Sequence, residues 1–411
     1  MNSEVASRLE EVMNRGIEEK EIAGMNFLVL KEGQEALYLE GGYADREKGR
    51  KISRDTIFRL YSMTKPVTAA AVMILFERGL IDLTEPVEKY IPGFQNQTVA
   101  GENGLEPVCS PVTIQQLLSM TSGLPYGDSY SITGRYMGEL FQEMDTRLYS
   151  ENPMTTQEFA DRSGRIPLEF QPGTAWKYGV SADILGAVVE QAAHMRFGEF
   201  LQKEIFEPLG MKDTGFYVPK EKRDRLALAY EREETFKGQS QAESICGKSG
   251  RTEWTLKPFT GNHLGILNKM DRQPAFESGG AGLVSTVDDY ANFARMLMDG
   301  GRFGKKQILL PETVRFMTSR KLTAQQQCYF DKWVGLNGYT YGNLMRIMQD
   351  EGQAHLAVSA GEYGWDGWLG CYFSNLPKEK MTILLMTQMK DAGTMPVTRK
   401  MRNVLLLGMP F

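Results

Sequence analysis

Residues 58–94 read FRLYSMTKPVTAAAVMILFERGLIDLTEPVEKYIPGF, and this stretch decides the fold prediction. It contains an S-x-x-K tetrapeptide that begins at Ser62 and ends at Lys65. Apolar and small residues then recur at helical spacing until Gly79, which predicts a helix that ends there. Pro66 fits such a helix only in its first turn. The sequence therefore places Ser62 at or near a helix N-terminus.

The spacing of this tetrapeptide suits nucleophilic catalysis. Residues i and i+3 lie on one helix face, so the Lys65 amine can reach the Ser62 hydroxyl. A serine hydroxyl is a poor nucleophile until a base removes its proton, and a lysine can be that base when burial lowers its pKa. The helix N-terminus also favours negative charge near Ser62. On this motif alone, a surface helix cap remains an equal alternative.

The composition excludes several classes of protein. The chain has 411 residues, of which 42% are hydrophobic and 24% are charged, as is typical of globular proteins with one or two domains. The net charge of −5 argues against nucleic acid as a partner. None of the three histidines, His194, His263 and His355, lies in a catalytic or metal-ligand motif, so we expect all three to be structural. We expect no metal and no cofactor.

No segment predicts export or membrane insertion. The N-terminus lacks the apolar stretch of a signal peptide. The longest apolar run, Ala69 to Phe76, is far shorter than the roughly 18 to 20 residues that span a bilayer. The four cysteines form no CxxC pair, so neither a zinc site nor a disulfide is expected. We expect a cytoplasmic protein with no membrane partner, and the oligomeric state stays open.

Strand patterns occur near both ends of the chain. A helix at 4–20 precedes strands at 25–31 and 36–41, which a turn at 32–34 joins into a hairpin. Further strands are predicted at 355–360, 369–375 and 381–386, before a closing helix at 397–407. The pattern from about residue 62 to 277 is mostly helical. It is followed by a short strand at 283–285 and a helix that Thr286 can cap.

This order predicts an α+β fold with one antiparallel sheet that helices flank. Residues 1–61 and 278–411 would form the sheet domain, built from both termini, and residues 62–277 an inserted, mostly helical domain. The segment 221–269 matches no pattern, and we expect it to shape the substrate cleft.

Five segments, in order along the chain, resemble the serine β-lactamase-like superfamily. That superfamily holds class C β-lactamases, penicillin-binding DD-peptidases, family VIII carboxylesterases, some D-amino-acid peptidases and acyltransferases. Besides 58–94, the segments are LLSMTSGLP (117–125), FQPGTAWKYGVSADILG (170–186), IFEPLGMKDTGF (205–216) and GGAGLVSTVDDYANFARML (279–297). Five ordered matches are much more specific than one S-x-x-K. The resemblance implies the fold predicted above and a serine hydrolase with Ser62 as nucleophile.

The resemblance also implies a catalytic role for Tyr178. This residue matches the tyrosine of the family's Y-x-N motif, which faces the nucleophile. A phenol close to a protonated lysine can have a lowered pKa and share the proton transfer. Packing against Trp176 is the structural alternative. Val180 replaces the motif's asparagine and cannot donate a hydrogen bond to a substrate amide, and esterase-like members commonly lack this asparagine too.

Two segments compete for the family's third motif, K-T-G or H-T-G. Lys248-Ser249-Gly250 fits the letters, but it precedes 279–297, which the motif should follow, and no strand pattern surrounds it. We interpret it as a chance match. Trp365-Asp366-Gly367 directly precedes a predicted strand and resembles the W-x-G variant of esterase-like members.

The W-x-G resemblance implies an oxyanion hole. Gly367 would permit close approach of the backbone, and the Trp368 N–H would pair with the Ser62 N–H to bind the oxyanion. Asp366 departs from the motif. It either faces the site, where its carboxylate repels acidic substrates or selects amines, or points to solvent.

The residues together predict a serine hydrolase that acts on small carboxylic esters through an acyl-enzyme. Both the asparagine and the K-T-G cation, which carboxylate-bearing β-lactams and D-Ala-D-Ala peptides need, are absent. A β-lactamase or D-Ala-type peptidase, another amidase, an acyltransferase and a non-catalytic binding protein remain alternatives. An α/β-hydrolase is excluded, because the chain has no G-x-S-x-G.

Overall fold

The structure is a computed structural model that describes residues 3–102, 104–237, 251–333 and 335–408. Its largest sheet has eight strands in the order β12-β13-β14-β15-β16-β1-β2-β3, and all neighbours pair antiparallel. The strands are β1 (Gly24–Lys31), β2 (Gln34–Asp45), β3 (Arg50–Lys51), β12 (Tyr339–Tyr341), β13 (Arg346–Met348), β14 (Tyr363–Asp366), β15 (Tyr372–Leu376) and β16 (Met381–Met386). The two ends of the chain meet where β1 pairs with β16.

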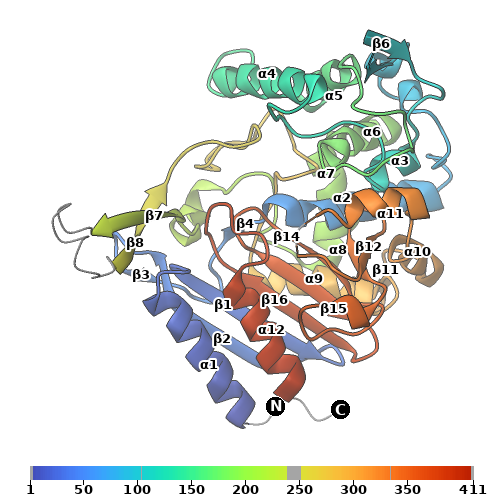
Figure 1. The fold of residues 1–411 in the computed structure, drawn as a ribbon. Helices are drawn as coiled ribbons and strands as arrows, with labels where there is room; N and C mark the ends of the chain where they lie inside the picture. The colour runs from blue at the N-terminus through green and yellow to red at the C-terminus, as the bar shows by residue number, and fades with distance from the viewer. Residues whose placement is uncertain (1–2, 103, 238–250, 334, 409–411) are drawn as a thin grey trace, which may run out of the picture.

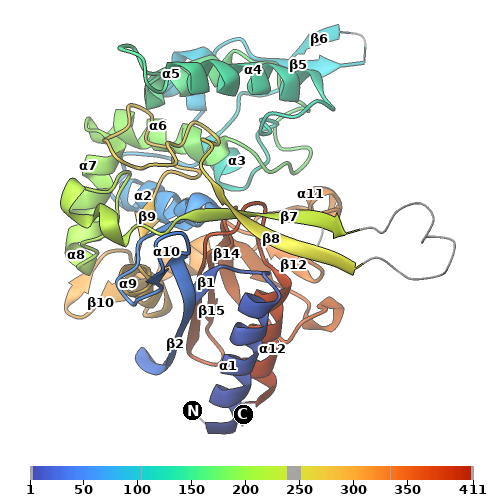
Figure 2. The same ribbon diagram turned by 90° about the vertical axis from the view of Figure 1, so that its left-hand side faces the viewer.

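Helices cover both faces of this sheet (Figures 1 and 2). The terminal helices α1 (Ser3–Glu18) and α12 (Pro396–Gly408) lie side by side on one face, and α9 (Val287–Met298) packs on the other, against β15 and β16. Strand β1 is buried on both sides: Met25 and Phe27 enter the core beneath α1 and α12, whereas Leu28 enters the larger core on the α9 side. An almost continuous apolar strand is what burial on two faces requires.

The helical part of the chain stacks above the sheet in Figure 1. Helix α2 (Thr64–Glu77) is its buried centre and packs against α6 (Ser181–Ala193) and β14. Its first twelve residues are all buried, which explains why its sequence is apolar or small on every face. The remaining helices of this part are α3 (Ile114–Leu118), α4 (Ile132–Arg147), α5 (Thr156–Gly164), α7 (Phe197–Leu201) and α8 (Glu207–Leu209).

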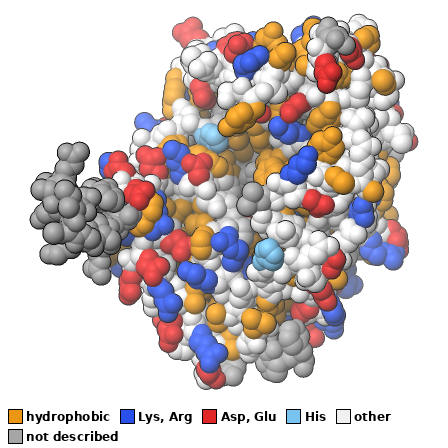
Figure 3. Space-filling view, in the orientation of Figure 1, with side chains coloured by type: hydrophobic (Ala, Val, Ile, Leu, Met, Phe, Trp, Pro, Cys, Tyr) orange, Lys and Arg blue, Asp and Glu red, His pale blue; other side chains and the backbone are white. Residues whose placement is uncertain are grey.

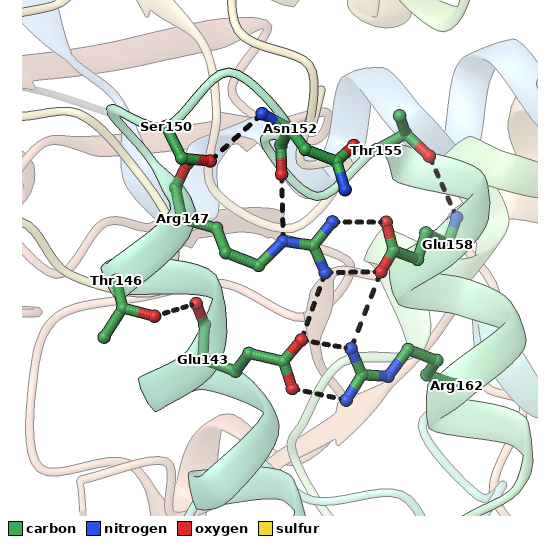
Figure 4. Close-up of polar contacts among 8 residues, drawn as sticks. All are labelled: Glu143, Thr146, Arg147, Ser150, Asn152, Thr155, Glu158 and Arg162. Carbon is green, nitrogen blue, oxygen red and sulfur yellow. Dashed lines mark hydrogen bonds and ion pairs between the residues drawn. The ribbon is translucent and has the colours of Figure 1, made fainter.

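An ion-pair network joins α4 to α5 (Figure 4), the two helices drawn at the top of Figure 1. Arg162 binds Glu143 through two parallel hydrogen bonds of 2.6 Å each, and Arg147 bridges Glu143 and Glu158. The two arginines lower the pKa of Glu143 to about 2. Because the members are partly exposed, solvent screens the network, and it orients the two helices more than it stabilises them.

Most of the predicted elements are present. The opening helix, the hairpin, the closing helix and the strand at 381–386 lie where predicted, and the Thr286 side chain accepts from the Asp289 N–H as a cap. The α+β fold class is confirmed, and all eight strands of the large sheet come from the two ends of the chain. The boundaries at 61/62 and 277/278 stay a prediction.

Two predictions of local structure were wrong. Residues 355–360 form no strand; they link β13 to β14, and the Ala357 N–H donates to the Asn403 side chain at 2.8 Å instead of to a sheet. The mostly helical part also holds two hairpins, β5–β6 (Thr98–Gly101 and Gly104–Pro107) and β7–β8 (Ala229–Lys237 and Arg251–Phe259). Strand β8 therefore begins directly after Lys248-Ser249-Gly250, where no strand was expected, and that tripeptide lies outside the described residues.

Two further structural features concern partners. No helix among the described residues is long and apolar enough to cross a membrane. Within the same residues, no three His, Cys, Asp or Glu side chains cluster in a way that could hold a metal ion.

Candidate active site

Ser62 lies in a single 3₁₀ turn, Tyr61–Met63, that leads directly into α2. Strand β4 (Phe58–Arg59), paired with β9 (Val284–Ser285), delivers the chain to this turn. Tyr61, the residue before Ser62, has a left-handed backbone with φ +45°, a conformation that costs about 1–3 kcal/mol and recurs at active sites. Pro66 lies in the first turn of α2, as predicted.

The Lys65 amine lies 3.0 Å from the Ser62 hydroxyl. It also contacts the Tyr126 hydroxyl at 3.0 Å and the Gly280 carbonyl oxygen at 2.9 Å. A neutral amine has two N–H donors and one lone pair. The Gly280 carbonyl and the Tyr126 hydroxyl can take the two donors, which leaves the lone pair for the Ser62 O–H.

The Lys65 side chain is completely buried, and burial lowers its pKa to about 7. The nearby carboxylates of Asp183 and Asp366 oppose this shift. At a pKa of about 7, about half of the amine is unprotonated at neutral pH, and this neutral form can accept the Ser62 proton. The predicted pair is therefore present with the geometry and the pKa of a nucleophile and its base.

Asp183 supports Lys65 from behind. Its carboxylate accepts from the Ser278 hydroxyl at 2.5 Å and from the Gly280 N–H at 3.0 Å, so it orients the loop whose Gly280 carbonyl receives the Lys65 amine. Sequence reasoning missed Asp183, although it belongs to the matched segment 170–186.

Tyr178 faces the Ser62–Lys65 pair, as predicted. The Lys65 nitrogen lies 4.6 Å from the Tyr178 ring centroid, and the Trp365 indole N–H donates to the Tyr178 hydroxyl at 3.0 Å. The expected lowering of the Tyr178 pKa is wrong. Burial raises the pKa of this phenol, although its hydrogen bonds with Ser62 and Trp365 act in the other direction. The phenol therefore stays protonated and is suited to donate a proton.

Tyr126 is a second tyrosine at the site, and sequence reasoning missed it. Its hydroxyl contacts Lys65, and its ring lies edge-on to Tyr178 with 5.7 Å between centroids. A Cβ on Gly179 would lie 2.0 Å from the Leu124 carbonyl oxygen, so only glycine allows this approach of the two tyrosine-bearing loops. The available signal was position, since Tyr126 directly follows the matched segment 117–125.

The third motif lies on β14 and the turn after it. A Cβ on Gly367 would lie 2.2 Å from the Leu60 carbonyl oxygen, so the missing side chain lets this turn reach the chain just before Ser62. Neither the Ser62 N–H nor the Trp368 N–H donates to a carbonyl among the described residues. Both amides are thus available to a substrate oxygen.

Asp366 lines the cleft and does not point to bulk solvent. Its carboxylate accepts a hydrogen bond from the Thr394 hydroxyl. Burial is the largest effect on the pKa of Asp366 and raises it. The positive charges of Arg346 and Lys65 oppose this rise, but the net pKa stays above its ordinary value. Of the two orientations considered for Asp366, the structure therefore shows the one that faces the site.

A cleft of about 720 Å³ opens over Ser62. Aromatic side chains form much of its apolar wall, and hydrophobic side chains gather across the upper middle of the face in Figure 3. The lining includes Tyr126, Tyr178, His263, Leu264, Trp333, Leu336, Trp365 and Trp368, together with the charged residues Arg346, Asp366, Asp391 and Arg399.

Two features of the cleft were not foreseen. His263, expected to be structural, lies in the cleft wall, whereas its position there with Leu264 agrees with the expectation that the segment 221–269 shapes the cleft. Two arginines also line the cleft. Arg346 is engaged by Glu362 and the Phe373 carbonyl, whereas Arg399 donates to the Thr394 carbonyl and forms no ion pair with a described carboxylate.

Comparisons with known proteins show the family and the fold of this chain. A family model described as Beta-lactamase matches residues 8–406. Esterase EstB of Burkholderia gladioli is 29% identical over 407 residues, which cover 97% of this chain and 94% of the esterase. A putative D-alanyl-D-alanine carboxypeptidase of Salmonella typhimurium is 26% identical over 88% of this chain and 78% of its own. The solved structure of EstCE1, a hydrolase with promiscuous acyltransferase activity, has a TM-score of 0.78 at 24% identity and covers 98% of each chain.

Proposed function

Because the chain belongs to the β-lactamase family of serine hydrolases, we propose that it hydrolyses small carboxylic esters through an acyl-enzyme on Ser62. One observation carries this proposal: a buried amine with a pKa near 7 lies 3.0 Å from the Ser62 hydroxyl. The aromatic cleft over Ser62 suits an apolar ester.

In the first half of the reaction, Ser62 Oγ attacks the ester carbonyl carbon while Lys65 takes the hydroxyl proton. The Ser62 and Trp368 N–H groups bind the oxyanion. The C–O bond to the alcohol then breaks, and the proton passes from Lys65 to the departing oxygen with the Tyr178 phenol as relay. Tyr178 suits this role because its raised pKa keeps it protonated.

The second half repeats these steps with water. Lys65 takes a proton from water, whose oxygen attacks the acyl carbon. The bond to Ser62 Oγ breaks, and the proton returns to that oxygen. The products are a carboxylic acid and the free enzyme.

Asp366 and Val180 support an ester rather than a β-lactam or D-Ala-D-Ala substrate. The Asp366 carboxylate occupies the middle of the third motif and disfavours a substrate carboxylate there. Val180 is fully buried and offers no hydrogen bond to a substrate amide.

A peptidase or β-lactamase activity is the second candidate, and Arg399 favours it. Its guanidinium lines the cleft without an ion-paired partner among the described residues, so it could hold a substrate carboxylate. Acyl transfer to an alcohol differs from hydrolysis only in the nucleophile that attacks the acyl-enzyme. We also propose that the protein is cytoplasmic and that a small-molecule substrate is its sole partner.

A direct comparison of substrates tests the proposal. We expect a p-nitrophenyl ester of a short acid to be hydrolysed with a higher kcat/KM than a chromogenic cephalosporin, and Ser62→Ala to abolish both activities. Arg399→Ala should leave the ester rate unchanged and lower any cephalosporin rate. A cephalosporin that is hydrolysed faster than the ester would replace the first candidate by the second, and ester turnover that survives in Ser62→Ala would refute both.

A further inference from the structure

We propose that Asp391 is a positioning residue for the oxyanion hole: it holds the Trp368 indole so that the Trp368 backbone N–H stays directed at the substrate. This inference rests on the proposed acyl-enzyme mechanism at Ser62. Asp391 belongs to none of the five segments that resemble the family, and it lies in the turn between β16 and α12.

The side-chain contact is short and charge-assisted. The Trp368 indole Nε1–H donates to Asp391 Oδ1 at 2.6 Å. A hydrogen bond to a carboxylate is about twice as strong as one between neutral groups.

The same turn also holds the Trp368 backbone. The Ala392 N–H donates to the Trp368 carbonyl at 3.0 Å, and the Met389 N–H donates to the Leu369 carbonyl at 2.8 Å. On the other side, the Gly367 N–H donates to the Cys371 carbonyl at 2.7 Å. With the ring and both neighbouring peptide groups fixed, the Trp368 N–H has little freedom to rotate.

Aromatic contacts complete the clamp. His263 stacks on the Trp368 ring with 4.0 Å between centroids and 24° between planes. The Tyr61 ring also contacts the indole, with 4.9 Å between the Tyr61 and Trp368 ring centroids and 58° between the planes, and Tyr61 is bonded directly to Ser62. The indole therefore connects the residues that carry the two oxyanion donors. An oxyanion hole depends on donors fixed before the charge develops, so this connection has a catalytic consequence.

Steady-state kinetics with a p-nitrophenyl ester test the role of Asp391. We expect Asp391→Leu and Trp368→Phe each to lower kcat about 10-fold or more, with KM changed less than about threefold. Asp391→Asn should keep most of the activity, because its amide oxygen still accepts the indole N–H. The double variant should lose no more than the worse single variant, since both break one contact. Affinity for a boronic acid that mimics the tetrahedral intermediate should fall in parallel with kcat.

An exposed aspartate outside the cleft gives the matched control: Asp224→Leu should change neither constant. Thermal unfolding of each variant separates loss of fold from loss of position. The proposal is overturned if Asp391→Leu stays folded with kcat within twofold of the parent, or if only KM changes. It is overturned equally if Asp391→Asn is as impaired as Asp391→Leu. Failure of the underlying mechanism looks different, because Ser62→Ala would then retain turnover.

Discussion

At the scale of single residues, the burial of Lys65 determines when the enzyme can work. Only the neutral amine can accept the Ser62 proton, so we predict that kcat/KM rises with pH and reaches a plateau above its pKa of about 7. The Asp366 carboxylate raises the pKa of Lys65. Asp366→Asn should therefore move the midpoint of this limb to lower pH. A pH–rate profile of both proteins measures the shift, and a midpoint that stays in place or moves upward would contradict the assignment of Lys65 as base.

The residues at this site differ in how far sequence could predict them. Ser62, Lys65 and Tyr178 stand in short motifs with fixed spacing, and Trp365 was found with the third motif. Tyr126 and His263 have no such motif, because tertiary contacts alone bring them to Lys65 and Trp368. The pKa of Tyr178 was predicted in the wrong direction. The prediction considered only the neighbouring lysine, whereas burial of the phenol, which depends on tertiary packing, has the larger effect and raises the pKa.

At the scale of elements, the proposed oxyanion hole depends on the close approach of β14 to the 3₁₀ turn at Ser62. We predict that Gly367→Ala lowers kcat at least 10-fold, because its Cβ would lie 2.2 Å from the Leu60 carbonyl oxygen and push the two backbones apart. Gly361→Ala is the matched control for general effects of glycine substitution near β14, since open space surrounds its Cβ position, although its φ of +88° adds backbone strain. Parent-like kcat in a folded Gly367→Ala would show that this close approach is unnecessary.

Element lengths explain which strands sequence could predict. Strand β16 (Met381–Met386) matches its prediction residue for residue, because six apolar or β-branched positions between turns give a strong pattern. Strands β12 and β13 have three residues each, too few for a period of two to be visible. The segment 355–360 shows the reverse error: Leu356, Ala357 and Val358 resemble a strand in sequence, but they are half-buried in a loop.

At the scale of the whole molecule, a buried charge cluster ties the sheet to α12. Glu362 is fully buried and binds Arg402 of α12 at 2.7 Å and Arg346 of β13 at 3.4 Å. Burial raises the pKa of Glu362, but the two arginines outweigh it and hold the net pKa below the ordinary value. We predict that Glu362→Gln destabilises the protein by about 3–5 kcal/mol, because it leaves two buried cations with a neutral partner.

Chemical denaturation of this variant at neutral pH measures the effect. The pKa of Glu362 is lower in the folded state than in the unfolded state, so its contribution is fully present above its ordinary pKa of 4.5 and is lost as pH falls below that value. The stability difference between parent and variant should therefore shrink in acid. A difference that is negligible at pH 7, or that grows as the pH falls, would contradict this role.

The order of elements allowed the fold class to be predicted, because strands at both ends with helices between them leave few ways to build one sheet. What sequence could not predict at this scale is the buried cluster itself. Its members, Arg346, Glu362 and Arg402, are 56 residues apart along the chain at most, and nothing in their local sequence marks them as partners.

The central claim is that Ser62 carries the acyl group during turnover, and peptide mass mapping after rapid acid quenching of a reaction with p-nitrophenyl butyrate tests it most directly. We predict a mass increase of one butyryl group on the peptide that contains Ser62, and no such increase in Ser62→Ala. A butyryl group on a different residue, or full turnover by an enzyme that never carries one, would contradict the account.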